Sequence, residues 1–324
     1  MRDIQFSTDT WKLKRPFIIT GHVFSGVDTL TVTITDGEHQ GRGEAAGVYY
    51  TGDDLANMRS QAESVRDALA GGADREALLD LLPAGGARNA IDCALWDLEA
   101  KQAGRRAWAL ADVFPGEITT FETVGIDTPE AMAEHARGLA SDRIKVKLDD
   151  VTPLDRIAAV RQAREDAEII VDVNQGWTFE RLRFLAPKFA DLGIAMIEQP
   201  LPRGGDEALE SYRSPVPLGA DESCLHTGEF EAAARRYQVI NIKLDKAGGL
   251  TEGLRLAQLA EDRGLDIMVG NMVGTSLAMA PGYVLAQLCR FVDLDGALFL
   301  ERDREHPMSY SKGRVGEPSP KLWG

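Results

Sequence analysis

Three carboxylates recur at nearly equal spacing along the middle of the chain, and each stands at the end of a short apolar run. The runs EIIV, IAMI and VPLGA lead into Asp172, Glu198 and Asp221, which lie 26 and 23 residues apart. A repeat of about 25 residues suits one β-strand, one helix and their loops, and reactive groups in a parallel αβ barrel lie at the C-terminal ends of its strands. The spacing therefore predicts a barrel with three acidic side chains at one mouth.

Lysines occupy the predicted strands on either side of these acids. The segment RIKVKLD carries Lys145 and Lys147, and the segment VINIKLDK carries Lys243. Residues two apart on a strand point to the same side, so Lys145 and Lys147 are expected to face the mouth together. One acid after a strand is usually a helix N-cap. Caps do not explain three acids on consecutive strands between two strands that bear lysines.

Such a set of residues suits acid–base chemistry at a carbon next to a carboxylate. Carboxylates are the ligands that Mg²⁺ prefers, with Mn²⁺ as the alternative ion, and three of them leave room for a substrate carboxylate. The proton α to a carboxylate is weakly acidic, because its removal places two negative charges on one small group. A divalent cation stabilises that charge as it forms. Lys147 and Lys243 are then expected to alternate between amine and ammonium, while Lys145 stays charged.

Composition limits the kinds of molecule that the protein can bind and the compartment in which it is expected. The net charge of −15 argues against a nucleic acid or an anionic membrane. Three cysteines without zinc-like spacing favour a reducing compartment over disulfides. The first residues lack the apolar stretch of a signal peptide, and no later run reaches the length of about 18 apolar residues that a membrane span needs. We therefore expect a cytoplasmic protein with a small-molecule substrate, and a homo-oligomer is compatible with the sequence.

The chain changes its pattern near residue 119. Residues 1–55 indicate an antiparallel sheet, because TLTVTIT alternates polar and apolar residues and a Gly-rich turn follows. Residues 55–112 show apolar residues at helical spacing. Beyond residue 119, short strands alternate with amphipathic helices. We expect strands near 119–125, 143–148, 168–173, 194–198, 216–220, 238–243, 265–270 and 289–294, with helices between them that include 129–140, 153–165, 178–190, 226–236 and 249–263.

Eight strands with seven intervening helices make an α/β fold of the (β/α)7β TIM-type barrel class. We expect an α+β capping domain over residues 1–117, completed by the Pro-containing tail 299–324, and a barrel domain over residues 118–298 that carries the catalytic groups. No low-complexity linker separates the two parts, so a packed interface is expected between them.

Several motifs bear a family resemblance. KVKLD, DVNQGW, EQPL, DES and NIKLDKAGG resemble the enolase superfamily, specifically its muconate-lactonizing-enzyme-like subgroup, over essentially the whole chain. Sites of this superfamily combine a lysine or histidine base with Mg²⁺. The resemblance implies that Asp172, Glu198 and Asp221 are the metal ligands, and that Lys147 and Lys243 are the acid/base pair. It also implies an N-terminal domain that closes over the barrel mouth and recognises the substrate side chain.

The last predicted strand narrows the resemblance. FVDLDG puts Asp293 and Asp295 on one face at the strand end. This pair is similar to the Asp-x-Asp with which dipeptide epimerases hold the free α-ammonium of their substrate. The resemblance implies a metal-dependent isomerase that epimerises L-Ala-Xaa dipeptides by two-base 1,1-proton transfer at the α-carbon of the C-terminal residue. It also implies that Thr123, Asn271 and Met272 line the pocket.

One stretch departs from the L-Ala-D/L-Glu epimerase group, which LPAGGARNAIDCALWDLEAK and NIKLDKAGGLTE otherwise resemble. Residues 17–28 would form the lid of the substrate pocket, and His22 and Phe24 are its expected substrate-binding residues. The stretch has no arginine or lysine to pair with a glutamate side chain. Small or apolar second residues are therefore expected to be accepted alongside Glu or ahead of it. The same subgroup offers alternatives: N-acylamino acid racemase, o-succinylbenzoate synthase and cycloisomerase. A binding protein without activity is disfavoured, because it has no need of opposed bases.

Overall fold

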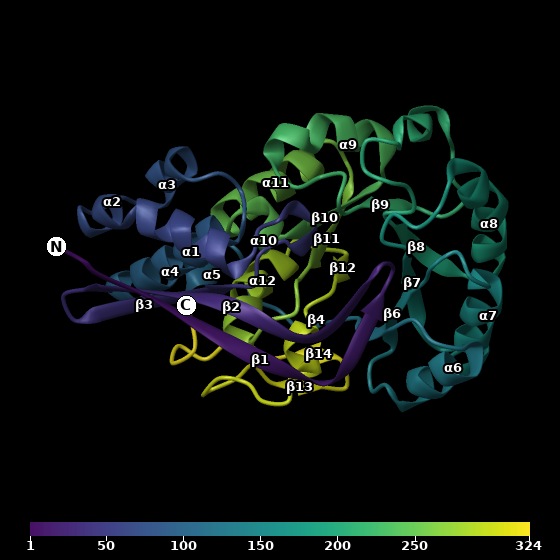
Figure 1. Ribbon diagram of the computed structural model, residues 1–324, viewed down its shortest axis with the longest axis horizontal. Coiled ribbons are helices and arrows are strands. Elements are labelled where there is room, and N and C mark those ends of the chain that lie inside the picture. Colours follow the sequence, from purple (N-terminus) through teal and green to yellow (C-terminus); the bar gives the residue numbers. More distant parts are fainter.

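The computed structural model describes residues 1–324 and begins with a long antiparallel unit (Figure 1). Strands β1 (Asp3–Ile19) and β2 (His22–Asp36) form a hairpin, and β3 (His39–Ala45) pairs with β2. The alternation expected for this region is present, since Leu30, Val32 and Ile34 are fully buried apolar side chains of the inner face. The register shifts where Pro16 interrupts β1, because proline has no backbone N–H to donate.

Helices cover one side of this sheet: α1 (Leu55–Ser64), α2 (Arg66–Ala70), α3 (Arg75–Leu81), α4 (Gly86–Ala103) and α5 (Ala107–Leu110). Helix α4 lies against β3 at glycines of the segment GRG. A Cβ at Gly41 or Gly43 would meet the backbone of α4 at Ala94 and Ala90. The two glycines therefore allow the close approach of helix and sheet.

The second unit is a curled sheet of eight parallel strands, hydrogen-bonded in chain order. These are β5 (Glu122–Val124), β6 (Arg143–Lys147), β7 (Glu168–Asp172), β8 (Ile194–Glu198), β9 (Leu218–Ala220), β10 (Val239–Lys243), β11 (Asp266–Gly270) and β12 (Phe291–Val292). The backbone N–H of Phe121 donates to the carbonyl of Val292 at 2.7 Å. This bond brings the chain before the first strand against the last one, which curls the sheet into a barrel with enclosed apolar side chains.

Helices alternate with these strands and cover the outside of the barrel (Figure 1). They are α6 (Pro129–Gly138), α7 (Pro153–Ala163), α8 (Phe179–Asp191), α9 (Phe230–Arg236), α10 (Leu244–Ala247), α11 (Leu250–Asp262) and α12 (Ser276–Ala286). The short 3₁₀ turns are η1 (Tyr49–Thr51), η2 (Glu207–Ser211), η3 (Thr227–Glu229) and η4 (Gly296–Phe299). The α/β class and the eight predicted strands are confirmed.

One connection differs from the expected alternation. Between β8 and β9 the chain forms only η2, so six of the seven links contain an α-helix. The segment 199–217 contains four prolines and two glycines. Proline removes backbone donors and glycine lowers helix stability, so a regular helix is disfavoured there.

The tail 299–324 runs along both units. Strands β13 (Tyr310–Ser311) and β14 (Arg314–Val315) pair with each other, and β14 pairs with β4 (Ile118–Thr119). Arg304 forms ion pairs with Asp9 and Glu44 of the antiparallel sheet. The indole N–H of Trp323 donates to the carbonyl of Cys93 in α4 at 2.9 Å.

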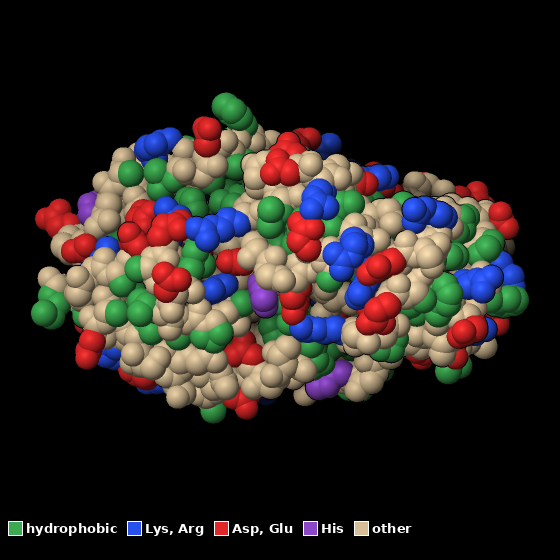
Figure 2. Space-filling view, turned by 90° about the horizontal axis from the view of Figure 1, so that it is seen from above, with side chains coloured by type: hydrophobic (Ala, Val, Ile, Leu, Met, Phe, Trp, Pro, Cys, Tyr) green, Lys and Arg blue, Asp and Glu red, His purple; other side chains and the backbone are tan.

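The outer surface is mixed in charge. Figure 2 shows acidic and basic side chains interspersed over one face, without a continuous patch of one sign. No helix combines the length and the apolar character that crossing a bilayer requires.

Candidate active site

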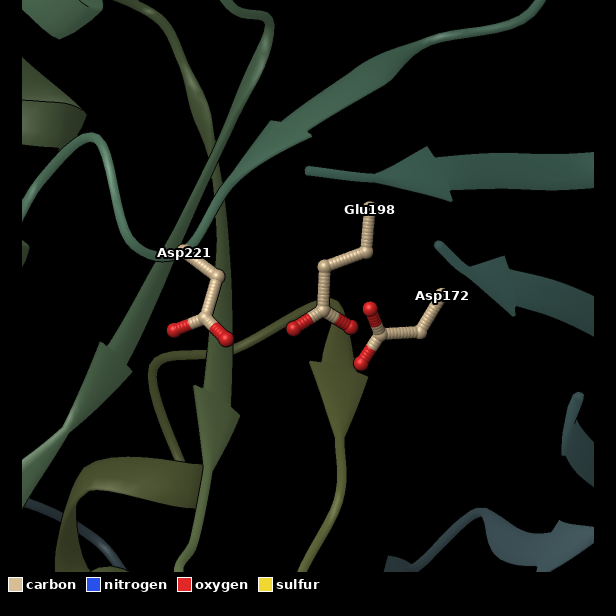
Figure 3. Close-up of side chains that lie close together, drawn as sticks. All are labelled: Asp172, Glu198 and Asp221. Atoms are coloured by element: carbon tan, nitrogen blue, oxygen red, sulfur yellow. The ribbon is translucent and has the colours of Figure 1, made fainter. Parts of the chain in front are cut away.

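The three predicted acids come together at the C-terminal ends of neighbouring strands (Figure 3). Asp172 ends β7, Glu198 ends β8, and Asp221 follows β9. Asp172 is paired in register with Glu198, so the two side chains leave the sheet at the same level. One oxygen of each carboxylate lies within 4.8 Å of the others, and all three residues are fully buried. The predicted cluster of acids is confirmed.

This donor set fits a divalent cation. Three buried carboxylates concentrate negative charge in a small volume, and buried charge needs pairing or coordination. All the donors are hard oxygens, the type that Mg²⁺ prefers. Asp172, Glu198 and Asp221 could therefore hold a metal ion, as the sequence predicted.

Lysines face these carboxylates from the flanking strands. Lys147 Nζ lies 2.5 Å from Asp172, and Lys243 Nζ lies 2.6 Å from Asp221. Lys145 points into the same cluster, as the strand period predicted, at 2.8 Å from Glu198. It also lies 3.2 Å from Asp172 and 2.9 Å from Asp293. Each positive charge at the mouth is thus neutralised by a carboxylate of an adjacent strand.

The ionisation of the cluster follows from this pairing. Burial opposes the charge on Lys145 and Lys243, but the nearby carboxylates outweigh it and raise the pKa of both lysines. Burial also acts against ionised Asp172, yet Lys147 and Lys145 lower its pKa to about 2. Glu198 differs, because burial and the neighbouring Asp172 raise its pKa despite the presence of Lys145. Glu198 is the acid of the three whose charge is least compensated by lysines.

A cavity of about 110 Å³ opens above the cluster. Lys147 and Lys243 both line it, together with Phe24, Asn271 and Met272, three of the predicted pocket residues. On the side of the antiparallel unit the wall is apolar or aromatic and consists mainly of Phe17, Ile19, Val27, Tyr49 and Tyr50. On the side of the barrel it is polar and includes Asn174, Asp221 and Glu222. The other predicted lid residue, His22, is exposed, and its ring lies 4.2 Å from that of Phe24 and 4.9 Å from that of Tyr49.

Three predicted residues, Thr123, Asp293 and Asp295, do not line the cavity of the two lysines. Asp295 accepts a hydrogen bond from the backbone N–H of Thr123 at 2.8 Å, and both line a neighbouring cavity of about 230 Å³ beside Lys14. Asp293 instead joins the lysine cluster, and its Oδ1 atom is buried without a hydrogen-bond partner. Strand β12 ends at Val292, so strand alternation does not extend over these two acids. Both acids are buried, and their joint contact with a substrate ammonium stays a prediction.

Three further residues support the acids and were not singled out from the sequence. Lys246 is buried and donates to the Asp221 carboxylate and to its backbone carbonyl, both at 2.6 Å. Asn241 donates to Glu198 at 2.6 Å. Gln199 accepts from the backbone N–H groups of Asp221 and Ser223 at 2.9 and 3.0 Å. Lys246 and Asn241 belong to the segment NIKLDK, in which only Lys243 stands at the end of a predicted strand.

Comparisons with known proteins agree with this geometry. The family model described as enolase C-terminal domain-like matches residues 130–319. The chain is 40% identical to the L-Ala-D/L-Glu epimerase of Escherichia coli (strain K12) over 97% of its own length and 99% of the relative. It is 45% identical to the N-acetyl-D-glutamate racemase of a Pseudoalteromonas species over 76% of its own length and 79% of the relative.

Solved structures are similar over the full length. An enolase family member from Agrobacterium tumefaciens with homology to dipeptide epimerases, bound to sodium and L-Ala-L-Glu, superposes with a TM-score of 0.97 at 38% identity, covering 100% of both chains. The dipeptide epimerase of Enterococcus faecalis, complexed with Mg and L-Leu-L-Tyr, has a TM-score of 0.90 at 28% identity and 98% coverage of both chains. The chain belongs to the enolase superfamily, in the enolase C-terminal domain-like family.

Proposed function

We propose that the chain is a metal-dependent dipeptide epimerase, an isomerase that inverts the α-carbon of the C-terminal residue. The observation that carries this proposal is the placement of the two lysines. Lys147 and Lys243 end the second and the sixth of eight strands, on opposite sides of the ring, and they line one cavity. A substrate α-carbon between them would present one face to each lysine.

The chemistry needs one lysine as amine and the other as ammonium. The amine removes the α-proton from one face, and the ammonium delivers a proton to the opposite face, so the configuration inverts and no atom is gained or lost. Asp172, Glu198 and Asp221 would hold Mg²⁺ or Mn²⁺. A bound cation supplies electrostatic stabilisation for the charge that develops on the substrate carboxylate. Lys145 adds a fixed positive charge beside it.

Two features support a dipeptide as substrate. The buried Oδ1 atom of Asp293 has no donor within the protein, and a substrate α-ammonium would supply one. The cavity wall formed by Phe17, Phe24 and Tyr49 suits an apolar side chain on the epimerised residue. The relatives named for L-Ala-D/L-Glu epimerisation add that Glu is also a candidate at this position.

The second candidate is racemisation of an N-acylamino acid. The 45% identity to an N-acetyl-D-glutamate racemase favours it, and the two-lysine chemistry would be the same. The difference lies at the amino group, because an acylated nitrogen carries no charge for Asp293 to pair with.

Substrate profiling distinguishes the two candidates. We expect kcat/KM for L-Ala-L-Glu or L-Ala-L-Leu to exceed that for N-acetyl-L-glutamate, with L-Ala-L-Leu within about a hundredfold of L-Ala-L-Glu. Asp293→Asn should lower kcat/KM for the dipeptides about tenfold or more, because a charge-assisted bond to the ammonium is lost. It should affect the acylated substrate much less. Faster turnover of N-acetyl-L-glutamate than of every dipeptide would instead establish the racemase.

We also propose that residues 1–117 with the tail 299–324 form the capping domain and residues 118–298 the catalytic domain. The contacts of Arg304 and Trp323 with the antiparallel unit support this division. The cytoplasm is the proposed compartment, because Cys93, Cys224 and Cys289 are all free thiols.

A further inference from the structure

A short turn connects the proposed base to the N-terminal unit. Helix α10 starts directly after Lys243, and its second residue, Asp245, is buried. The Oδ1 atom of Asp245 accepts hydrogen bonds from the backbone N–H groups of Ala46 and Gly47, both at 2.9 Å. The proposed chemistry makes no use of Asp245.

The segment that Asp245 holds is a compact loop, residues 46–53. Gly47 has a φ of +74°, and a Cβ there would collide with the carbonyl of Asp53, so the turn requires glycine. Within the loop, the N–H groups of Thr51 and Asp53 donate to the carbonyl of Val48 at 3.0 and 3.3 Å. At its far end, the Asp53 carboxylate accepts from Gly86 at the start of α4 at 2.7 Å. The loop therefore has its own internal structure.

This loop forms one wall of the cavity above the two lysines. Tyr49 and Tyr50 line the cavity that Lys147 and Lys243 also line. The two bonds to Asp245 are the only hydrogen bonds between residues 46–53 and the parallel unit. Among the side chains of the parallel unit, Asp245 is thus the one that holds the loop of Tyr49 and Tyr50 by hydrogen bonds, and it lies two residues beyond Lys243.

We propose that Asp245 is a positioning residue that holds the loop 46–53, and with it Tyr49 and Tyr50, in place over the substrate cavity. This inference rests on the proposed function and adds a residue to it. Asp245 does not touch the reacting atoms. It acts through the backbone of Ala46 and Gly47, so its effect falls on substrate binding rather than on proton transfer.

The chemistry of the contact identifies the informative variants. A single oxygen, Oδ1, accepts both bonds, and the carbonyl oxygen of an asparagine can do the same. Burial raises the pKa of Asp245 from 3.8 to about 7, so the site disfavours a charge on this side chain and suits a neutral amide. Asp245→Asn should therefore keep both hydrogen bonds and the position of the loop. Asp245→Ala removes the acceptor and leaves the two N–H groups without partners.

The chain offers a matched control at the same interface. Asp92 of α4 is also a fully buried acid, and it accepts from the backbone N–H and the hydroxyl of Thr251 at 3.0 and 2.5 Å. It does not line the cavity of the two lysines. Asp92→Ala thus removes a comparable contact between the two units without touching the tyrosine wall.

The experiment compares the wild type with Asp245→Ala, Asp245→Asn and Asp92→Ala in the Mg²⁺-loaded full-length protein. We expect Asp245→Ala to raise KM for the best dipeptide about tenfold and to change kcat by less than about threefold, as for lost ground-state binding. Asp245→Asn and Asp92→Ala should keep KM within about twofold of the wild type. Amide hydrogen exchange at Ala46 and Gly47 should accelerate at least about tenfold in Asp245→Ala alone.

The possible outcomes distinguish a failure of the positioning role of Asp245 from a failure of the proposed function. A KM unchanged in Asp245→Ala, or raised equally in Asp92→Ala, would overturn the positioning role. Amide exchange at Ala46 and Gly47 that is identical in the wild type and Asp245→Ala would also overturn it. If Asp245→Ala does not fold, Asp245→Ser gives the same comparison with a shorter side chain. A wild type that epimerises no dipeptide and racemises no acylamino acid would contradict the proposed function, while the exchange measurement would still decide the role of Asp245.

Discussion

Lys147 and Lys243 each form an ion pair with a different metal-site acid, Asp172 and Asp221. Each lysine therefore stands next to the site where the substrate carboxylate would bind, but on its own side of it. A base must lie within reach of the proton that it removes, and these two positions reach opposite faces of one carbon. At the level of single residues, the arrangement supports two bases of opposite stereochemical preference.

Replacing one lysine should therefore separate the two half-reactions. Lys147→Ala and Lys243→Ala should each lose epimerisation, because one face of the carbon has no proton donor or acceptor. In D₂O, we expect each variant to exchange the α-proton of one configuration only, and the two variants to select opposite configurations. Proton NMR of L-Ala-L-Glu and L-Ala-D-Glu follows the exchange. Undiminished epimerisation by Lys243→Ala would rule out the two-base scheme.

At the level of secondary structure, the ends of three strands position the acids. Strands β7, β8 and β9 deliver one acid each, and the register of β7 with β8 places Asp172 beside Glu198. The connecting segments then fix the carboxylates. Gln199 accepts hydrogen bonds from two backbone N–H groups of the loop after β9, and Lys246 of α10 donates a hydrogen bond to the Asp221 carboxylate. Ligands held in this way need little rearrangement to bind a cation.

Metal binding should depend on all three strand ends. Asp221→Asn replaces a charged ligand with a neutral one, and we expect at least about a tenfold weaker Mg²⁺ affinity by calorimetry, with activity abolished and the circular dichroism unchanged. Asp97→Asn is the control. Asp97 of α4 is equally buried but accepts from the backbone N–H of Arg42 at 2.8 Å, far from the cluster, and its variant should bind Mg²⁺ as the wild type does. Full activity after exhaustive chelation would contradict the metal requirement.

The molecule as a whole is held together by buried polar contacts between its two units. Asp92 reaches Thr251 in α11, Asp245 reaches the loop 46–53, and Glu44 accepts from Thr275 and Arg304. Burial raises the pKa of all three acids. Such groups make the stability of the assembly depend on pH, because the unfolded chain ionises them at lower pH than the folded one.

The sign of this dependence can be tested at Asp92. Burial raises its pKa from 3.8 to about 6, so its contribution to stability is greatest below about pH 4 and falls as the pH rises to about 6. Asp92→Asn removes this titration. We expect the stability difference between wild type and variant to shrink by about 1 kcal/mol from pH 5.0 to pH 7.5 in urea unfolding. A difference that grows over this range would show that folded Asp92 is readily ionised.

Local pattern accounts for much of this protein. Strand-sized apolar runs, helical spacing and the period of two within RIKVKLD were enough to predict the eight strands and the meeting of Lys145 and Lys147 with three acids. Parallel strands of a barrel have their C-terminal ends at one mouth, so chain position determines location there. The same logic does not extend past Val292, because β12 is too short for strand alternation to place Asp293 and Asp295.

Contacts between distant segments lie beyond such reasoning. The hydrogen bonds of Asp245 to Ala46 and Gly47 join residues nearly 200 positions apart, and no periodicity relates them. Lys246 follows no strand-end rule, yet it is fully enclosed against Asp221. A polar side chain can bind the metal, hydrogen-bond to a metal ligand or connect the two units, and which of these it does depends on the residues that pack against it. That environment is set by the docking of the antiparallel unit on the barrel, because burial and partners arise only when both surfaces meet.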